Sequence, residues 1–479
     1  MSTVRRIAKN TSVLFIAQII SYILGFFITM YTAQYLGAEG FGTISLALSL
    51  TGIFVILADM GLGSLMIREI AQDKSLTDKY ISNILLMKIL LTFLMIGAIA
   101  LTVNLKGDSE LVKIVIYLIT LSTIVNVFNG VFISIFQANE KVEYLAINII
   151  LNSVLMITGT IIGITYQLNI LYFASIYIIA NIIGLVYSIN VYVWKFSLPK
   201  IDIDLNFWKP TLLEAWPFGF TALFATIYFY IDSVILSFMV NNEVVGWYNA
   251  AYRLIIVLLF IPTVLNVVIF PVMSQLYKSS KDSLKFAYEK YFQYMVMIGI
   301  PIGVGVTLLA NKIILLIFGA AYTNSIIALQ ILVWAAVIIF ISGAFARLLE
   351  ASNKQLTLTK ITAICAVINI VLNLLLIPKF TYIAASATTV LTELLAFLMG
   401  MKVVSNMGYA PSKKEYAYII KSIFASLIMG IFIVYLNHLN LFILIIIGII
   451  VYFTTIFIIK GFDEEDLNLL KVLLGKTES

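Results

Sequence analysis

Apolar stretches long enough to cross a membrane recur along almost the whole chain. A helix needs about 20 apolar residues to span the hydrocarbon core of a bilayer. We count fourteen such stretches, centred near Ser21, Leu50, Thr92, Ile124, Leu155, Ala180, Thr226, Phe260, Gly299, Val333, Val367, Leu391, Ile428 and Ile450. This pattern predicts an all-α integral membrane protein whose solvent is lipid. The first stretch follows Arg5, Arg6 and Lys9 and is too long for a signal peptide, so we expect an uncleaved helix.

The composition excludes most soluble classes of protein. Of the 479 residues, 62% are hydrophobic and 11% are charged, and the mean hydropathy is +1.06. Soluble domains carry about 25% charged residues, so a soluble enzyme, a nucleic-acid-binding module and a disordered tail are excluded. The net charge of +6 is attributed to cationic loops that lie against anionic lipid. One cysteine and one histidine exclude a disulfide framework and a His-rich metal site, and we predict no metal and no catalytic residue.

The distribution of Lys and Arg predicts the orientation. With the N-terminus inside, 24 of the 30 basic residues fall on inner segments and four on outer loops. The positive-inside rule then places both termini in the cytoplasm of a multi-pass protein of the cell membrane.

Two internal matches, six spans apart, divide the chain. Residues 38–42 (AEGFG) match 242–246 (NEVVG), and residues 136–141 (FQANEK) match 349–354 (LEASNK). We predict an N-terminal lobe over 1–200, a cytoplasmic linker over 201–210, a C-terminal lobe over 211–406, and two extra helices with a short tail over 407–479. An even separation predicts two six-helix lobes related by a pseudo-two-fold axis along the membrane normal. Because apolar and polar residues alternate in the linker, we expect it to be strand-like or interfacial.

The landmarks of the chain resemble a known transporter family. They are Trp216-Pro217-Phe218, residues 245–253 (VGWYNAAYR), residues 270–274 (FPVMS), residues 35–42 (YLGAEGFG), residues 318–322 (FGAAY) and residues 374–378 (LLLIP). In their order and spacing the chain resembles the polysaccharide-transporter branch of the multidrug/oligosaccharidyl-lipid/polysaccharide exporter superfamily. The Wzx-type O-antigen flippases belong to this branch. The resemblance implies a V-shaped bundle, alternating access and an oligosaccharide on a polyprenyl diphosphate as substrate. Residues 379–385 (KFTYIAA) depart from it, since members often carry glycines there.

Two pairs of charged residues lie within the spans. Inserting one charged side chain into the centre of a membrane helix costs roughly 2.5–3.5 kcal/mol of free energy. Asp232 and Arg253 both lie about 10 Å below the outer surface. They form either a structural ion pair or a site in which Arg253 meets the diphosphate and Asp232 restrains it. Lys88 and Asp59 are the corresponding pair in the N-terminal half, unless Lys88 extends to the inner headgroups instead.

Three further charges are candidates for binding or coupling. Arg68 and Arg347 end their spans at the inner surface, either as anchors to the headgroups or as a vestibule that captures the substrate. Glu393 lies near the middle of a span. It either forms hydrogen bonds, for example to Thr388, Thr389 or Thr392, or binds a coupling H⁺ or Na⁺.

The leading function is a flippase that moves a lipid-linked glycan from the inner to the outer leaflet. A multidrug or cation antiporter of the same superfamily is the first alternative. A membrane glycan polymerase, ligase or acyltransferase is a weaker one, because the outer loops are short. We therefore predict a transporter and not an enzyme, with membrane lipids, the lipid-linked substrate and other glycan-assembly membrane proteins as partners, and no nucleic acid.

Overall fold

The computed structural model describes residues 3–196, 202–410 and 413–462. Every regular secondary-structure element within these residues is a helix. The N-terminal helices are α1 (Thr3–Asp59), α2 (Leu62–Gln72), η1 (Lys74–Leu76), α3 (Thr77–Lys106), α4 (Glu110–Ala138), α5 (Val142–Thr165) and α6 (Ile170–Phe196). The others are α7 (Leu205–Met239), α8 (Asn242–Leu258), α9 (Phe260–Ser279), α10 (Lys281–Ile317), η2 (Ala320–Tyr322), α11 (Ser325–Ala351), α12 (Gln355–Asn406), α13 (Lys413–Tyr435) and α14 (Leu441–Ile458).

Two of the helices are too long to be single spans. Twelve segments of the described chain are long and apolar enough to cross a membrane. Helix α1 has 57 residues, or about 85 Å at 1.5 Å per residue, against a hydrocarbon core of about 30 Å. Its backbone leaves the helix at Gly37 (φ 68°, ψ −179°), and α12 does so at Thr381 (φ 51°, ψ −132°). Counting both helices twice gives the fourteen predicted spans, with the centres Ser21 and Leu50 on opposite sides of Gly37.

The break at Thr381 lies in the loop that departs from the family pattern. A positive φ is uncommon for any residue but glycine, and it is strained for a β-branched residue. In this chain a threonine takes the positive φ in that loop, which a glycine would adopt without strain.

The described chain forms two compact units whose boundaries differ from those of the sequence repeat. The first unit contains residues 1–249 and 373–382, and the second contains residues 250–372 and 383–479. Helix α7 and the start of α8 therefore pack with the N-terminal helices. The predicted division at 201–210 follows the repeat in the sequence and stays a prediction.

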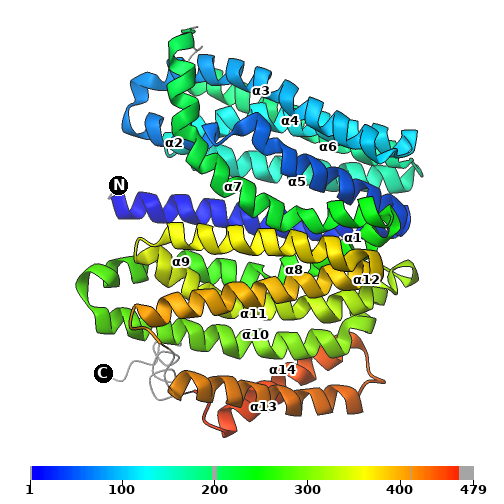
Figure 1. The fold of residues 1–479 in the computed structure, drawn as a ribbon. Coiled ribbons are helices and arrows are strands. Elements are labelled where there is room, and N and C mark those ends of the chain that lie inside the picture. Colours follow the sequence, from blue (N-terminus) through cyan, green and yellow to red (C-terminus); the bar gives the residue numbers. More distant parts are fainter. Residues whose placement is uncertain (1–2, 197–201, 411–412, 463–479) are drawn as a thin grey trace. The chain divides into compact units, whose positions relative to one another are not determined.

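The first unit is a bundle in which α4 contacts α1, α3, α5 and α6. Figure 1 shows α3, α4 and α6 running side by side. Two apolar clusters fill it, one around Leu50, Ile119 and Phe173, and the other around Met66, Ile84 and Phe136.

In the second unit, α10 is the central helix. It packs against α9, α11, α13 and α14. An aromatic cluster of Tyr288, Phe292 and Phe345 joins α10 to α11. The two helices outside the repeat are attached through Tyr452, whose hydroxyl donates to the carbonyl of Met297 at 2.7 Å.

The two copies of the first sequence repeat contact each other through their backbones within the first unit. A Cβ atom on Gly42 would lie 1.7 Å from the carbonyl oxygen of Asn242, and one on Gly246 would lie 1.9 Å from the carbonyl oxygen of Ala38. In the repeat, Gly42 matches Gly246 and Ala38 matches Asn242. Replacing each residue by its match therefore turns the contact of Gly42 with Asn242 into the contact of Gly246 with Ala38, as a local two-fold axis requires. Both positions need glycine because any side chain would collide with backbone.

The two copies of the second repeat end their helices, α4 and α11, with the same backbone geometry. Glu140 and Asn353 match in sequence, and both adopt a left-handed conformation, with φ of 57° and 58°. Lys141 and Lys354 then donate their backbone N–H to the carbonyls of Phe136 and Leu349, each at 2.8 Å. This 6→1 hydrogen bond defines a Schellman ending, so the match reflects the same backbone geometry in both halves.

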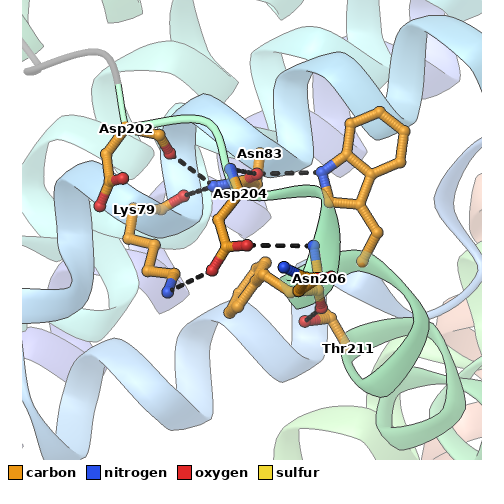
Figure 2. Close-up of polar contacts among 8 residues, drawn as sticks. Lys79, Asn83, Asp202, Asp204, Asn206 and Thr211 are labelled. Carbon is orange, nitrogen blue, oxygen red and sulfur yellow. Dashed lines mark hydrogen bonds and ion pairs between the residues drawn. The ribbon is translucent and has the colours of Figure 1, made fainter.

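The described part of the linker is attached to α3 by the buried side chain of Asn83 (Figure 2). The amide of Asn83 donates to the carbonyls of Lys79 and Asp202, at 2.8 and 2.7 Å. Its oxygen accepts the backbone N–H of Asp204 and the indole N–H of Trp208, both at 2.9 Å. All four hydrogen-bonding positions of the amide are thus used, which fixes the start of α7 to α3.

The expected strand does not form in this segment, because Asp204 begins a helix. Its carboxylate accepts the backbone N–H of Asn206 at 3.0 Å and caps α7. Lys79 forms an ion pair with the same carboxylate at 2.9 Å and holds the pKa of Asp204 below its usual value. The residues from Leu205 onward are therefore helical, and their alternation in the sequence reflects no strand.

Candidate functional site

Lys88 and Asp59 form the ion pair that the sequence predicts, in the first unit. Lys88 Nζ lies 2.6 Å from Asp59 Oδ1 and 3.3 Å from the carbonyl oxygen of Val127. The lysine is 1% exposed, so it does not extend to the headgroups. The Asp59 side chain keeps 34% of its surface exposed. The carboxylate is the accessible member of this pair, and the ammonium is enclosed.

Arg68 of α2 is held by two carboxylates, one from its neighbour Glu69 and one from Glu214 of α7. It pairs with Glu69 at 2.7 Å and with Glu214. Its guanidinium lies 5.7 Å from the ring centroid of Phe218. The hydrogen bonds that the guanidinium donates to both glutamates raise the pKa of Arg68, which stays charged. One positive and two negative groups leave this cluster with a net negative charge, which is unfavourable for an anionic headgroup.

Asp232 is buried and is held by neutral donors. The Tyr248 hydroxyl donates to Oδ2 and the Asn373 amide donates to Oδ1, both at 2.6 Å. One residue further along each of the two helices, Asn249 donates to Ser233 at 2.9 Å. Tyr248 and Asn373 are partners that sequence reasoning missed. The only available signal was a polar residue at each of these positions inside an apolar span.

Arg253 and Glu393 are both half-buried in the second unit. Pairing of Arg253 with Asp232 stays a prediction. Near Glu393, the Thr392 hydroxyl donates to the carbonyl oxygens of Thr388 and Thr389, at 2.9 and 3.1 Å. The role of Glu393 in coupling also stays a prediction.

Arg347 lines a cavity of 540 Å³ within the second unit. The other lining residues lie on one face of α9 and are Thr263, Asn266, Val267 and Phe270. Two contacts orient the guanidinium. Nη1 lies 2.6 Å from a carboxylate oxygen of Glu350, and the guanidinium carbon lies 5.9 Å from the centroid of the Phe270 ring.

The predicted site residues are thus distributed over several local environments. Asp59, Lys88, Arg68 and Asp232 belong to the first unit, and Arg253, Arg347 and Glu393 to the second. In the described ranges, no group of three His, Cys, Asp or Glu side chains is arranged to hold a metal ion. The chemistry available at these residues is recognition of charge and of hydrogen-bonding groups.

Two family profiles match the chain. The profile described as polysaccharide biosynthesis protein matches residues 7–277, and the MatE profile matches residues 217–375.

Three curated relatives extend the comparison. The capsular polysaccharide biosynthesis protein CapF of Staphylococcus aureus is 25% identical and covers 81% of this chain and 97% of CapF. The probable low-salt glycan biosynthesis flippase Agl15 of Haloferax volcanii is also 25% identical and covers 81% of both chains. The uncharacterized membrane protein MJ1068 of Methanocaldococcus jannaschii is 31% identical over 163 residues, so the match spans 32% of that protein's length.

Solved structures share the fold. The lipid II flippase MurJ in its inward closed conformation superposes with a TM-score of 0.78 at 18% identity, over 93% of this chain and 98% of MurJ. An inward-facing multidrug resistance MATE family transporter superposes with a TM-score of 0.67 at 17% identity, over 82% of this chain and 96% of that chain. Both likenesses agree with the exporter fold expected from the sequence.

Proposed function

Because the chain belongs to the polysaccharide biosynthesis protein family, we propose that it is a flippase for a polyprenyl-diphosphate-linked oligosaccharide. It moves the glycan from the cytoplasmic to the outer leaflet by alternating access. The observation that carries the proposal is the match over residues 7–277 to that family. The likeness to CapF, whose name places it in capsular polysaccharide biosynthesis, and to Agl15, named a probable flippase, covers 81% of this chain in each case and supports it.

The physical need for such a protein follows from the substrate. A diphosphate and a set of sugar hydroxyls cannot cross hydrocarbon without partners, because an unpaired buried charge is very costly. Transport therefore requires polar groups within the spans and no chemical step. We propose that the chain translocates its substrate without modifying it, in the cell membrane, with both termini in the cytoplasm.

The test of the function is a cell in which the gene is deleted. We expect the surface glycan to disappear and its lipid-linked precursor to accumulate inside, with unchanged sensitivity to drugs. The antiporter alternative predicts the reverse, namely increased drug sensitivity with a normal surface glycan. Its support is the MatE match to residues 217–375. That result would replace the present proposal.

Among the basic residues, Arg253 is our first candidate for contact with the diphosphate. It is half-buried inside α8. By contrast, Lys88 and Arg68 are already paired with carboxylates in the first unit. A planar guanidinium can bind two phosphate oxygens at once, which an ammonium group cannot do. Lys88 and Arg68 remain secondary candidates, because a substrate would first have to displace Asp59 or the two glutamates.

Replacing Arg253 by alanine is expected to slow leaflet exchange in liposomes by about tenfold or more. Losing one hydrogen bond to a charged group costs roughly 1.5–3 kcal/mol, and 1.4 kcal/mol corresponds to tenfold. Arg253→Lys keeps the charge but loses the planar fork, so we expect an intermediate rate. A folded Arg253→Ala protein with the wild-type rate would remove Arg253 from the substrate site.

Asp232 and Glu393 are our candidates for a coupling site that binds H⁺ or Na⁺. The geometry around Asp232 favours it over Glu393, since Tyr248 and Asn373 hold a buried carboxylate in one orientation. Leaflet exchange by an Asp232→Asn variant should no longer respond to a proton or sodium gradient. An unchanged response in that variant would contradict this role. Asp59, which pairs with Lys88, is the corresponding candidate in the N-terminal half.

A further inference from the structure

The cavity of the second unit has the dimensions of a ligand site. Its volume of 540 Å³ lies within the roughly 300–1,000 Å³ of small-molecule pockets. Thr263, Asn266, Val267 and Phe270 follow the i, i+3, i+4, i+7 spacing of one helix face. Arg347 of α11 completes the lining. Polar and aromatic groups thus converge here on a space that no described residue fills.

The charge of this cavity does not suit a phosphate. An ion pair of Arg347 with Glu350 at 2.6 Å and a hydrogen bond between the same side chains at 2.8 Å neutralise the guanidinium. Both partners are about a quarter exposed. The guanidinium of Arg347 would attract an incoming diphosphate, but the carboxylate of Glu350 beside it would repel the same group. The cavity is therefore polar and close to neutral, which differs from the cationic site expected at Arg347.

The hydrogen-bonding groups of the cavity are oriented but incompletely used. Arg347 Nε is buried and has no hydrogen-bond partner among the described residues. The oxygen of Asn266 accepts the Tyr291 hydroxyl at 2.7 Å, so its NH₂ group is the part that can donate to a ligand. The Thr263 hydroxyl donates to the carbonyl of Leu259 at 2.8 Å, and its oxygen can accept. The buried Nε is enclosed by the protein, so the groups that remain for a ligand are the Asn266 NH₂ group and the Thr263 oxygen. One donates and the other accepts, which suits a ligand rich in hydroxyl groups.

An aromatic surface adjoins these groups. The Phe270 side chain is 37% exposed and lines the cavity next to the guanidinium. A pyranose ring has the matching chemistry, with an apolar C–H face that packs on an aromatic ring and hydroxyls around its edge that both donate and accept. A free diphosphate has neither the apolar face nor the donors.

We propose that this cavity is a carbohydrate subsite that binds an uncharged sugar ring of the lipid-linked glycan. Phe270 packs against the face of the ring, and Asn266 and Thr263 bind its hydroxyls. The proposal rests on the proposed function and makes the Arg347–Glu350 pair part of the wall of a sugar site instead of a site for the diphosphate. It makes the affinity of the protein depend on the glycan as well as on the lipid carrier.

The test compares two lipids on the purified full-length protein. One is the lipid-linked glycan extracted from cells that lack this gene and accumulate it, and the other is polyprenyl diphosphate of the same chain length without sugar. We expect the wild-type protein to bind the first lipid about tenfold more tightly, a difference of about 1.4 kcal/mol. Phe270→Leu and Asn266→Leu should bring this ratio close to one without changing the Kd of the bare lipid.

Controls separate this subsite from the fold and from the function. Phe286 of α10 is similarly exposed but does not line the cavity, so Phe286→Ala should keep the tenfold ratio. A ratio near one in the wild type, a ratio retained in the folded Phe270→Leu protein, or an equal loss for both lipids would overturn the proposal. Leaflet exchange by the wild type is measured separately. Exchange with no glycan dependence would refute only the subsite, and glycan-dependent binding without exchange would refute only the flippase.

Discussion

Replacing Gly246 by alanine is expected to destabilise the protein by about 3 kcal/mol, the upper end of the cost of overpacking a core. The new Cβ atom would lie 1.9 Å from the carbonyl oxygen of Ala38, a backbone atom that no side-chain rotation can move. The ordinary effect has the opposite sign, since glycine inside a helix is less stable than alanine by about 1 kcal/mol. Gly42→Ala should behave in the same way, because its Cβ would meet the backbone of Asn242.

Thermal unfolding of the purified protein in detergent measures this effect. Gly97 of α3 is the matched control, because nothing lies within 4 Å of a Cβ atom placed there. Gly97→Ala should leave the Tm unchanged or raise it, while Gly246→Ala and Gly42→Ala lower it. Equal Tm values for Gly246→Ala and Gly97→Ala would mean that the reciprocal glycine contact does not exist in the folded protein.

Removing either member of the Lys88–Asp59 pair is expected to cost about 3 kcal/mol, at the low end of the roughly 3–5 kcal/mol for breaking a buried pair. The two single variants should differ. Asp59→Asn leaves an ammonium that is 1% exposed, whereas Lys88→Met leaves a carboxylate whose side chain is 34% exposed. We therefore expect Asp59→Asn to be the more damaging of the two.

The double variant separates packing from transport. Replacing both members of a buried ion pair is often close to neutral, so Lys88→Met with Asp59→Asn should recover most of the lost Tm. If the double variant also recovers leaflet exchange, the pair only joins helices. If it is stable but inactive, the charges take part in transport. A double variant no more stable than the single ones would show that Lys88 and Asp59 are not coupled.

Much of the fold could be predicted because hydropathy and helix breaks are local properties. The fourteen spans follow from apolar stretches, and Gly37 supplies the conformation needed where α1 reverses. Lys88 and Asp59 could be paired because their depths in neighbouring spans agree. The strand-like alternative for the linker was wrong, because the alternation after Asp202 competed with the helix-capping signal of Asp204, and the residues from Leu205 onward are helical.

The environments of the site residues could not be predicted in the same way. Asp232 binds Asn373, 141 positions away, and no spacing rule connects residues on such distant spans. The ion pair of Arg347 with Glu350 could have been predicted from the sequence, because side chains three residues apart on a helix are neighbours. The positions of Asn266 and Phe270 opposite Arg347 depend on how α9 packs on α11, which only the structure gives.

The most direct measurement of the central claim is leaflet exchange in liposomes that contain the purified protein and the fluorescent lipid-linked glycan. The account predicts exchange well above that of empty vesicles, and a rate that falls when Arg253 is replaced by alanine. An exchange rate equal to that of empty vesicles, in a protein shown to be folded and inserted, would contradict the assignment as a flippase.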